Sequence, residues 1–168
     1  FETVDRTAAR LGLPVERIAK LDANENVYGP SPKAVAAVAA YSPWNLYPDP
    51  IQAEARQALA RYVGVSAEHI MLTNGGDELL AMLYHLFLSP GDNVVDCSPS
   101  FEMYGLYARL YHAELRLALR DPENDYAISS QDIRAQVNPR TKMIMVCNPN
   151  NPTGTFMPLE QVVSLLDA

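Results

Sequence analysis

The sequence predicts an α/β fold in which helices cover both faces of a mostly parallel sheet, giving three αβα layers. From residue 69 onward, short apolar runs alternate with helical patterns, which is typical of parallel strands joined by crossover helices. The run over 142–147 is almost continuously apolar and predicts a strand of a largely parallel sheet. The chain has 168 residues, 48% hydrophobic and 20% charged, which is typical of a soluble globular protein.

The first 50 residues predict two helices and an extended arm. Residues 2–11 have helical periodicity, with apolar side chains on one face. Five of the 13 prolines lie between residues 27 and 50, which favours extended backbone there. Within this arm we expect a short helix over 33–40, capped by Ser31 and started by Pro32.

The rest of the chain predicts strands and helices in alternation. The helix over 51–63 should end at Gly64. The helix over 77–88 is apolar on most sides, so we expect it to be buried. In chain order the expected elements are a helix over 51–63, a strand over 69–73, a helix over 77–88, a strand over 93–97, a helix over 101–112, a strand over 114–119, a helix over 130–137, a strand over 142–147 and a helix over 158–166.

Composition argues against several classes of protein. The net charge of -7 disfavours nucleic acid or an anionic membrane as a partner, and no apolar run reaches the roughly 20 residues of a membrane span. Cys97 and Cys147 are predicted to be buried, reduced thiols, and the histidines fit no metal motif, which favours the cytoplasm and no metal site. The sequence stops at Ala168 within an expected helix, which suggests a piece of a longer protein.

The segment 73–78, Thr-Asn-Gly-Gly-Asp-Glu, joins an expected strand to an expected helix. Its glycines permit positive φ and a close approach of the backbone, and the first N–H groups of the helix can bind an anion. The segment is therefore a candidate phosphate cradle. The alternative is a tight turn with Asn74 or Asp77 as a helix cap.

Three other segments could form a binding site. The loop 148–154, Asn-Pro-Asn-Asn-Pro-Thr-Gly, follows an apolar strand and could present Asn151 to a ligand oxygen; otherwise it is a proline-stiffened turn. The segment 98–104 also follows a strand, and one of its aromatic rings could stack on a flat ligand instead of packing in the core. The segment 21–30 alone is only a polar loop.

Together, these segments resemble the pyridoxal-phosphate-dependent aminotransferases of fold type I. The matching motifs are an Asn-Glu-Asn arm, a Tyr-Pro-Asp segment, a Gly-x-Asp-Glu turn, a Pro-x-Phe-x-Met-Tyr segment and the Asn-Pro-Asn-Asn-Pro-Thr-Gly loop; they lie at 24–31, 46–49, 75–78, 99–104 and 148–154. The resemblance covers essentially the whole chain. It implies that 1–50 is an N-terminal helix and arm, and that 51–168 is the incomplete first part of the pyridoxal-phosphate-binding large domain.

The resemblance implies a role for individual residues. Gly76 and Asp77 fall where the family binds the cofactor phosphate, and Asn151 falls where it binds the 3-hydroxyl. The ring that stacks on the cofactor corresponds to Phe101, or less well to Tyr104. Tyr47 falls where a tyrosine of the family reaches the cofactor phosphate of the partner in a homodimer. Asn24 and Glu25 fall in the arm that lines the family's substrate pocket.

Two departures from the family stand out. Val27 replaces the proline that is usual in the arm. More important, the family's Schiff-base lysine, the aspartate that pairs with the pyridine nitrogen and a carboxylate-binding arginine lie in the half that follows the matching region. The chain's three lysines, Lys20, Lys33 and Lys142, stand in other contexts. We therefore expect the chain to contain no catalytic residue of its own and to be inactive alone.

Within the family, the arm and the Tyr-Pro-Asp segment most resemble the branch that acts in histidine biosynthesis. That resemblance implies transfer of an amino group between L-histidinol phosphate and 2-oxoglutarate. The alternatives are an aromatic-amino-acid aminotransferase, a threonine-phosphate decarboxylase, or a non-catalytic binding domain.

Overall fold

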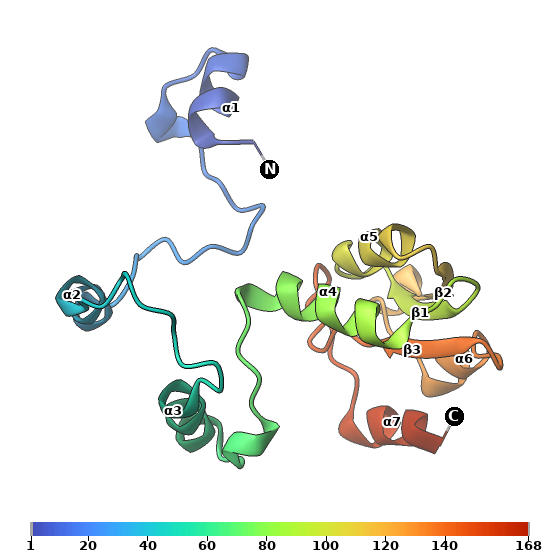
Figure 1. Cartoon of the computed structure of the whole chain (residues 1–168). Helices are drawn as coiled ribbons and strands as arrows, with labels where there is room; N and C mark the ends of the chain where they lie inside the picture. The colour runs from blue at the N-terminus through green and yellow to red at the C-terminus, as the bar shows by residue number, and fades with distance from the viewer. Residues whose placement is uncertain (1, 168) are drawn as a thin grey trace. The chain divides into compact units, whose positions relative to one another are not determined.

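The computed structural model describes residues 2–167, so the expected chain end at Ala168 lies outside the described residues. The chain forms two compact units, Phe1–Ile51 and Gln52–Ala168 (Figure 1). The first unit contains α1 (Val4–Leu11), the short 3-10 turn η1 (Val15–Arg17) and α2 (Pro32–Ala40).

Both helices of the first unit lie close to where the sequence predicts them. The Thr3 hydroxyl accepts a hydrogen bond from the Arg6 N–H at the start of α1, and Gly12 ends this helix in the left-handed region. Ser31 does occupy the N-cap position of α2, but its side chain makes no capping hydrogen bond there. The expected hydroxyl cap is therefore wrong, and only the Ser31 carbonyl accepts, from the Val35 N–H at 3.1 Å.

The second unit is built on a three-stranded parallel sheet, which confirms the predicted fold class. Its strands are β1 (Asn93–Ser98), β2 (Glu114–Leu119) and β3 (Thr141–Met145), in the order β2-β1-β3. The other elements of this unit are α3 (Ala53–Val63), η2 (Ala67–His69), α4 (Gly75–Phe87), α5 (Met103–Leu110), η3 (Pro122–Asn124), α6 (Ser130–Arg134), α7 (Leu159–Ser164) and η4 (Leu165–Asp167).

Helices cover both faces of the sheet. In Figure 1, α4 and α5 lie on one face of the sheet and α6 and α7 on the other. Side chains alternate between the faces along β1, so Val94 packs with Tyr84 and Ala108 beneath α4 and α5. Val95 and Cys97 point the other way, into a second cluster with the side chains of α6 and α7. The sheet therefore separates two apolar cores, as expected for three layers.

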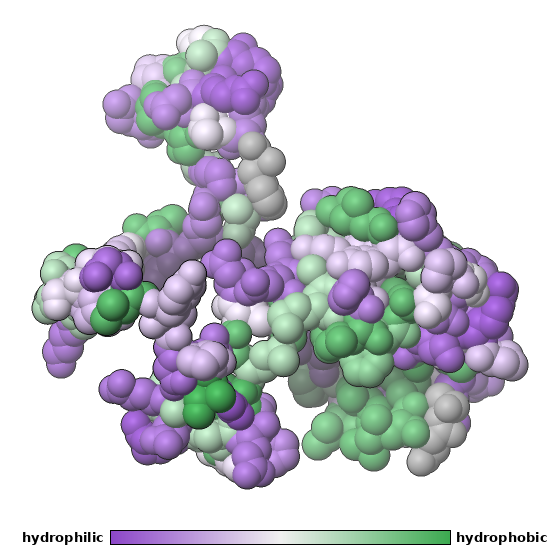
Figure 2. Space-filling model, in the orientation of Figure 1, coloured by the Kyte–Doolittle hydropathy of each residue, from purple (hydrophilic) through white to green (hydrophobic). Residues whose placement is uncertain are grey.

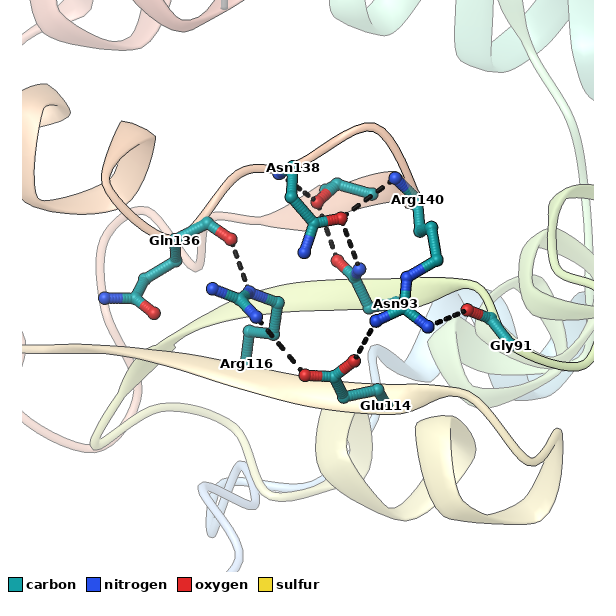
Figure 3. Close-up of polar contacts among 8 residues, drawn as sticks. Gly91, Asn93, Glu114, Arg116, Gln136, Asn138 and Arg140 are labelled. Atoms are coloured by element: carbon teal, nitrogen blue, oxygen red, sulfur yellow. Dashed lines mark hydrogen bonds and ion pairs between the residues drawn. The ribbon is translucent and has the colours of Figure 1, made fainter.

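The amino ends of the strands are joined by polar side chains (Figure 3). The Arg140 guanidinium lies 3.2 Å from the Glu114 carboxylate and 3.3 Å from the Gly91 carbonyl oxygen. The buried Asn93 donates to the Asn138 side-chain oxygen at 2.9 Å and accepts from Thr141 at 2.6 Å. This network fixes the end of the sheet that lies opposite the loops described below.

Two predictions about the strands and helices of this unit are wrong. The strand expected over 69–73 does not form: Ile70 has extended backbone, but no strand among residues 2–167 pairs with this segment, and both sides of β1 are already occupied. The expected burial of α4 also fails, because Met82, Leu86 and Phe87 are exposed on its outer face. Figure 2 shows hydrophobic surface over α4 and α7.

Candidate functional site

The loops that follow β1 and β3 leave the sheet from the same edge, because the two strands are parallel neighbours. From β1 the chain crosses to β2 on one side, whereas β3 lies on the other side of β1. The β1–β3 boundary is thus the point where the connections diverge. In open α/β sheets, ligands bind at this point, beyond the carboxyl ends of the strands.

Asn150 joins the two loops. Its side chain is 3% exposed, and its amide nitrogen donates to the Pro99 carbonyl oxygen at 3.1 Å and to the Thr153 hydroxyl at 2.8 Å. Its backbone N–H donates to the Thr155 carbonyl at 2.7 Å, and its carbonyl accepts from the Gly154 N–H at 2.7 Å. The loop after β3 is therefore fixed both within itself and to the loop after β1.

The predicted ligand-binding residue Asn151 follows directly in this fixed loop. It is half-buried, and its backbone N–H donates to the Cys147 sulfur at 3.3 Å. The Cys147 thiol also lies near the phenol of Tyr104, at the start of α5. The structure thus brings Asn151 and the 98–104 segment to one edge of the sheet. Cys97 is a free, buried thiol, as predicted, whereas Cys147 is free but only half-buried, so its expected burial is wrong.

Phe101 and Tyr104 pack against each other edge to face. Their ring centroids are 5.6 Å apart, the rings are at 84°, and both side chains are half-buried. Burial, together with the nearby Cys147 thiol, raises the pKa of Tyr104 to about 12, so its phenol is neutral at physiological pH. Because the two rings are nearly perpendicular, only one of them can lie parallel to a planar ligand, while the other supports it from the side.

The candidate phosphate cradle forms the start of α4. Gly75 has φ +77, a conformation that favours glycine, whereas Gly76 has ordinary helical backbone. A Cβ atom on Gly76 would meet no heavy atom within 4 Å, so the space in front of its backbone is open. The N–H groups of Gly76 and Asp77 lie in the first turn, where a helix supplies no backbone acceptor. This arrangement fits an anion such as a phosphate group.

The alternative prediction of a side-chain cap at this turn is wrong for Asn74. Asn74 occupies the N-cap position but makes no side-chain capping bond, and instead its backbone N–H donates to the Glu78 carboxylate. The Thr73 hydroxyl donates to the Gly75 carbonyl at 2.8 Å. These contacts hold the turn without covering Gly76.

Three predicted site residues belong to the first unit. Asn24 has φ +53, Glu25 accepts a hydrogen bond from the Lys20 ammonium at 2.7 Å, and Tyr47 is fully exposed. Their roles in substrate or cofactor binding stay predictions.

Sequence reasoning missed two buried charges near this edge. Asp96 is 6% exposed and accepts a hydrogen bond from the Ser100 hydroxyl at 2.5 Å. Burial raises the pKa of Asp96, although the Ser100 hydrogen bond opposes this shift. Arg120 is 5% exposed and donates to the Cys97 carbonyl at 3.0 Å. The signal for Asp96 was available, since a lone carboxylate interrupts the apolar run over 93–97.

Among residues 2–167, no cluster of three or more histidine, cysteine, aspartate or glutamate side chains could hold a metal ion. Within the same residues, no helix has the length and apolarity that crossing a bilayer requires.

Comparison with known proteins gives one consistent match. The family model described as "Aminotransferase class I and II" matches residues 16–168. A histidinol-phosphate aminotransferase from Roseiflexus castenholzii is 44% identical, covering 98% of this chain and 45% of the relative. Another, from Dehalococcoides mccartyi strain CBDB1, is 41% identical over 89% of this chain and 41% of the relative. The chain thus spans somewhat under half the length of these curated relatives.

A solved structure matches almost the whole chain. Histidinol-phosphate aminotransferase from Sinorhizobium meliloti, in complex with pyridoxal-5'-phosphate, superposes with a TM-score of 0.85 at 25% identity, over 99% of this chain and 45% of that one. Aspartate aminotransferase from Thermus thermophilus with maleate gives a TM-score of 0.63 at 32% identity, over 68% of this chain and 31% of that one.

Proposed function

The chain belongs to the class I and II aminotransferase family, and from this membership we propose that the full-length protein transfers an amino group between L-histidinol phosphate and 2-oxoglutarate with pyridoxal 5'-phosphate. The full-length protein is this chain together with whatever its gene encodes on either side. The proposal depends mainly on one contact: the Asn150 side chain donates to the Pro99 carbonyl and so joins the 148–154 and 98–104 segments at the carboxyl edge of the sheet. Relatives at 41–44% identity are named for this substrate.

The residues of this chain would bind and orient the cofactor. The backbone N–H groups of Gly76 and Asp77 would bind its phosphate, because the helix start offers free donors and a favourable field. The Phe101 ring would cover one face of the pyridine, Asn151 would bind the 3-hydroxyl, and Tyr104 would support Phe101 from the side. When bound, the cofactor supplies an electron sink, and the protein supplies position and electrostatics.

The substrate is tested in the full-length protein loaded with cofactor. We expect the largest kcat/KM with L-histidinol phosphate as amino donor and 2-oxoglutarate as acceptor, at least about tenfold above aromatic amino acids. Higher kcat/KM for an aromatic amino acid, or decarboxylation of threonine phosphate, would assign the protein to another branch of the family. Cofactor binding without any transamination or decarboxylation would favour a binding domain.

We further propose that the full-length protein is a homodimer in which Tyr47 of one copy contacts the cofactor phosphate of the other. Tyr47 lies on a proline-stiffened arm, between Pro43 and Pro48, and its side chain is fully exposed in this chain. A fully exposed tyrosine on such an arm is available for contact with a second subunit. We also propose a cytoplasmic location, since Cys97 and Cys147 are free thiols.

Replacing Tyr47 with phenylalanine should weaken cofactor binding severalfold, because one hydrogen bond to a charged phosphate is lost. Cofactor titration of the full-length protein measures this change. Tyr62→Phe is a matched control, since Tyr62 is also exposed but lies on α3 outside the arm. If Tyr47→Phe and the control bind cofactor equally well, Tyr47 does not have this role.

A further inference from the structure

The segment 99–104, which carries Phe101, is anchored to the sheet by a buried carboxylate. Asp96 is the fourth residue of β1, a strand whose first five residues are buried. Its carboxylate accepts from the Ser100 hydroxyl at 2.5 Å, one residue before Phe101. Burying a carboxylate is costly, whereas an apolar residue at this position would avoid the cost. The short hydrogen bond from Ser100 offsets part of this cost.

Two other elements hold the same segment from its two ends. The Asn150 side chain donates to the Pro99 carbonyl at 3.1 Å, and the Tyr84 hydroxyl donates to the Tyr104 carbonyl at 2.9 Å. Tyr84 lies on α4, the helix whose first turn is the candidate phosphate cradle. The segment that carries the ring is thus tied to α4, to β1 and to the loop that carries Asn151.

We propose that Asp96 is a positioning residue for cofactor binding: through Ser100 it fixes the backbone that presents the Phe101 ring to the cofactor. This inference rests on the proposed function of the site. Without the Asp96–Ser100 bond, the segment would keep its end anchors at Pro99 and Tyr104 but would lose the one next to the ring. The ring would then sample several orientations, and the cofactor would have to bind a less ordered surface.

The surroundings of Asp96 favour this role. The phenols of Tyr84 and Tyr104 are close enough to interact with its charge, and burial raises the pKa of both, so both stay neutral. Burial has the largest influence on the pKa of Asp96 and raises it. Hydrogen bonds from the Ser100 hydroxyl and the Cys97 backbone oppose this shift, as does the positive charge of Arg120, which follows β2.

The test compares two variants of the full-length protein with the unaltered protein. Ser100→Ala removes the hydroxyl, and Asp96→Asn keeps an acceptor oxygen but removes the charge. We expect Ser100→Ala to weaken binding of pyridoxal 5'-phosphate at least about fivefold and to reduce the circular dichroism that the bound cofactor shows in its absorption band. Asp96→Asn should fall between Ser100→Ala and the unaltered protein in both measurements.

Ser129→Ala is the matched control. Its hydroxyl donates to Asp132 at 2.5 Å, the same distance as in the Ser100–Asp96 pair, but this pair caps α6 on the other face of the sheet. The control should lower the unfolding temperature while leaving cofactor affinity and circular dichroism unchanged. A Ser100→Ala protein that behaves like the control would overturn the inference. Failure of the unaltered protein to bind the cofactor would instead contradict the proposed function.

Discussion

Replacing Gly76 with valine in the full-length protein is expected to weaken pyridoxal phosphate binding at least tenfold, equivalent to about 1.4 kcal/mol. The first turn of α4 offers free N–H groups, and each hydrogen bond to a charged group contributes roughly 1.5–3 kcal/mol. The space in front of Gly76 is open, so a branched side chain would occupy the position of the phosphate oxygens without striking the protein. Titration of the cofactor absorbance against folded protein measures the change.

The neighbouring glycine provides the control. Gly75 has φ +77, so Gly75→Ala should strain the turn and lower the unfolding temperature. Gly76 has no such φ, and alanine is a better helix former than glycine, so Gly76→Ala should fold at least as well as the unaltered protein. Loss of stability with unchanged cofactor affinity in Gly76→Val would show that this turn is only a helix start and that the phosphate binds elsewhere.

Reduction with borohydride after mixing the 168-residue chain with pyridoxal phosphate is expected to leave no lysine labelled stoichiometrically. A Schiff base requires an unprotonated amine beside the cofactor. Hydrogen bonds to Glu25 and Asp22 raise the pKa of Lys20, which keeps it protonated. Lys142 is the second residue of β3, at the end of the strand opposite the site loops, and Lys33 lies in the first turn of α2.

Intact mass before and after reduction decides this prediction. The full-length protein is the positive control, and it should carry one cofactor on a lysine outside the present sequence. One cofactor per chain, bound to Lys20, Lys33 or Lys142, would contradict the expectation that the short chain is inactive.

The sequence predicted those elements whose local pattern and tertiary contacts agree. The run over 114–119 coincides with β2, and the run over 93–97 falls one residue short of β1. In both cases the apolar pattern lies on a strand that pairs within the sheet. The strand over 69–73 failed because a strand needs a hydrogen-bonding neighbour, which a local pattern does not reveal. The prediction that α4 is buried failed for a similar reason, because the hydrophobicity of a helix does not reveal which elements cover it.

The candidate site also contains residues that the sequence pattern selects and residues whose role only the structure reveals. The turn at Gly75 and the loop around Asn151 stand out by their composition, so the sequence alone is enough to select both. Asp96 stands out in the sequence as a lone carboxylate within an apolar run, but its role, like that of Asn150, comes from contacts with Ser100 and Pro99 in three dimensions. Whether Asn24, Glu25 and Tyr47 belong to the same site stays a prediction.

The polar network at the amino ends of the strands has a consequence for protein engineering. A strand of six residues, such as β1, is about 20 Å long, which exceeds the roughly 7–10 Å within which substitutions usually influence one another. Changes around Arg140 and Glu114 should therefore add independently to changes in the loops at the other end. This end of the sheet is a place to raise thermal stability in a variant whose loops have been redesigned for a different substrate.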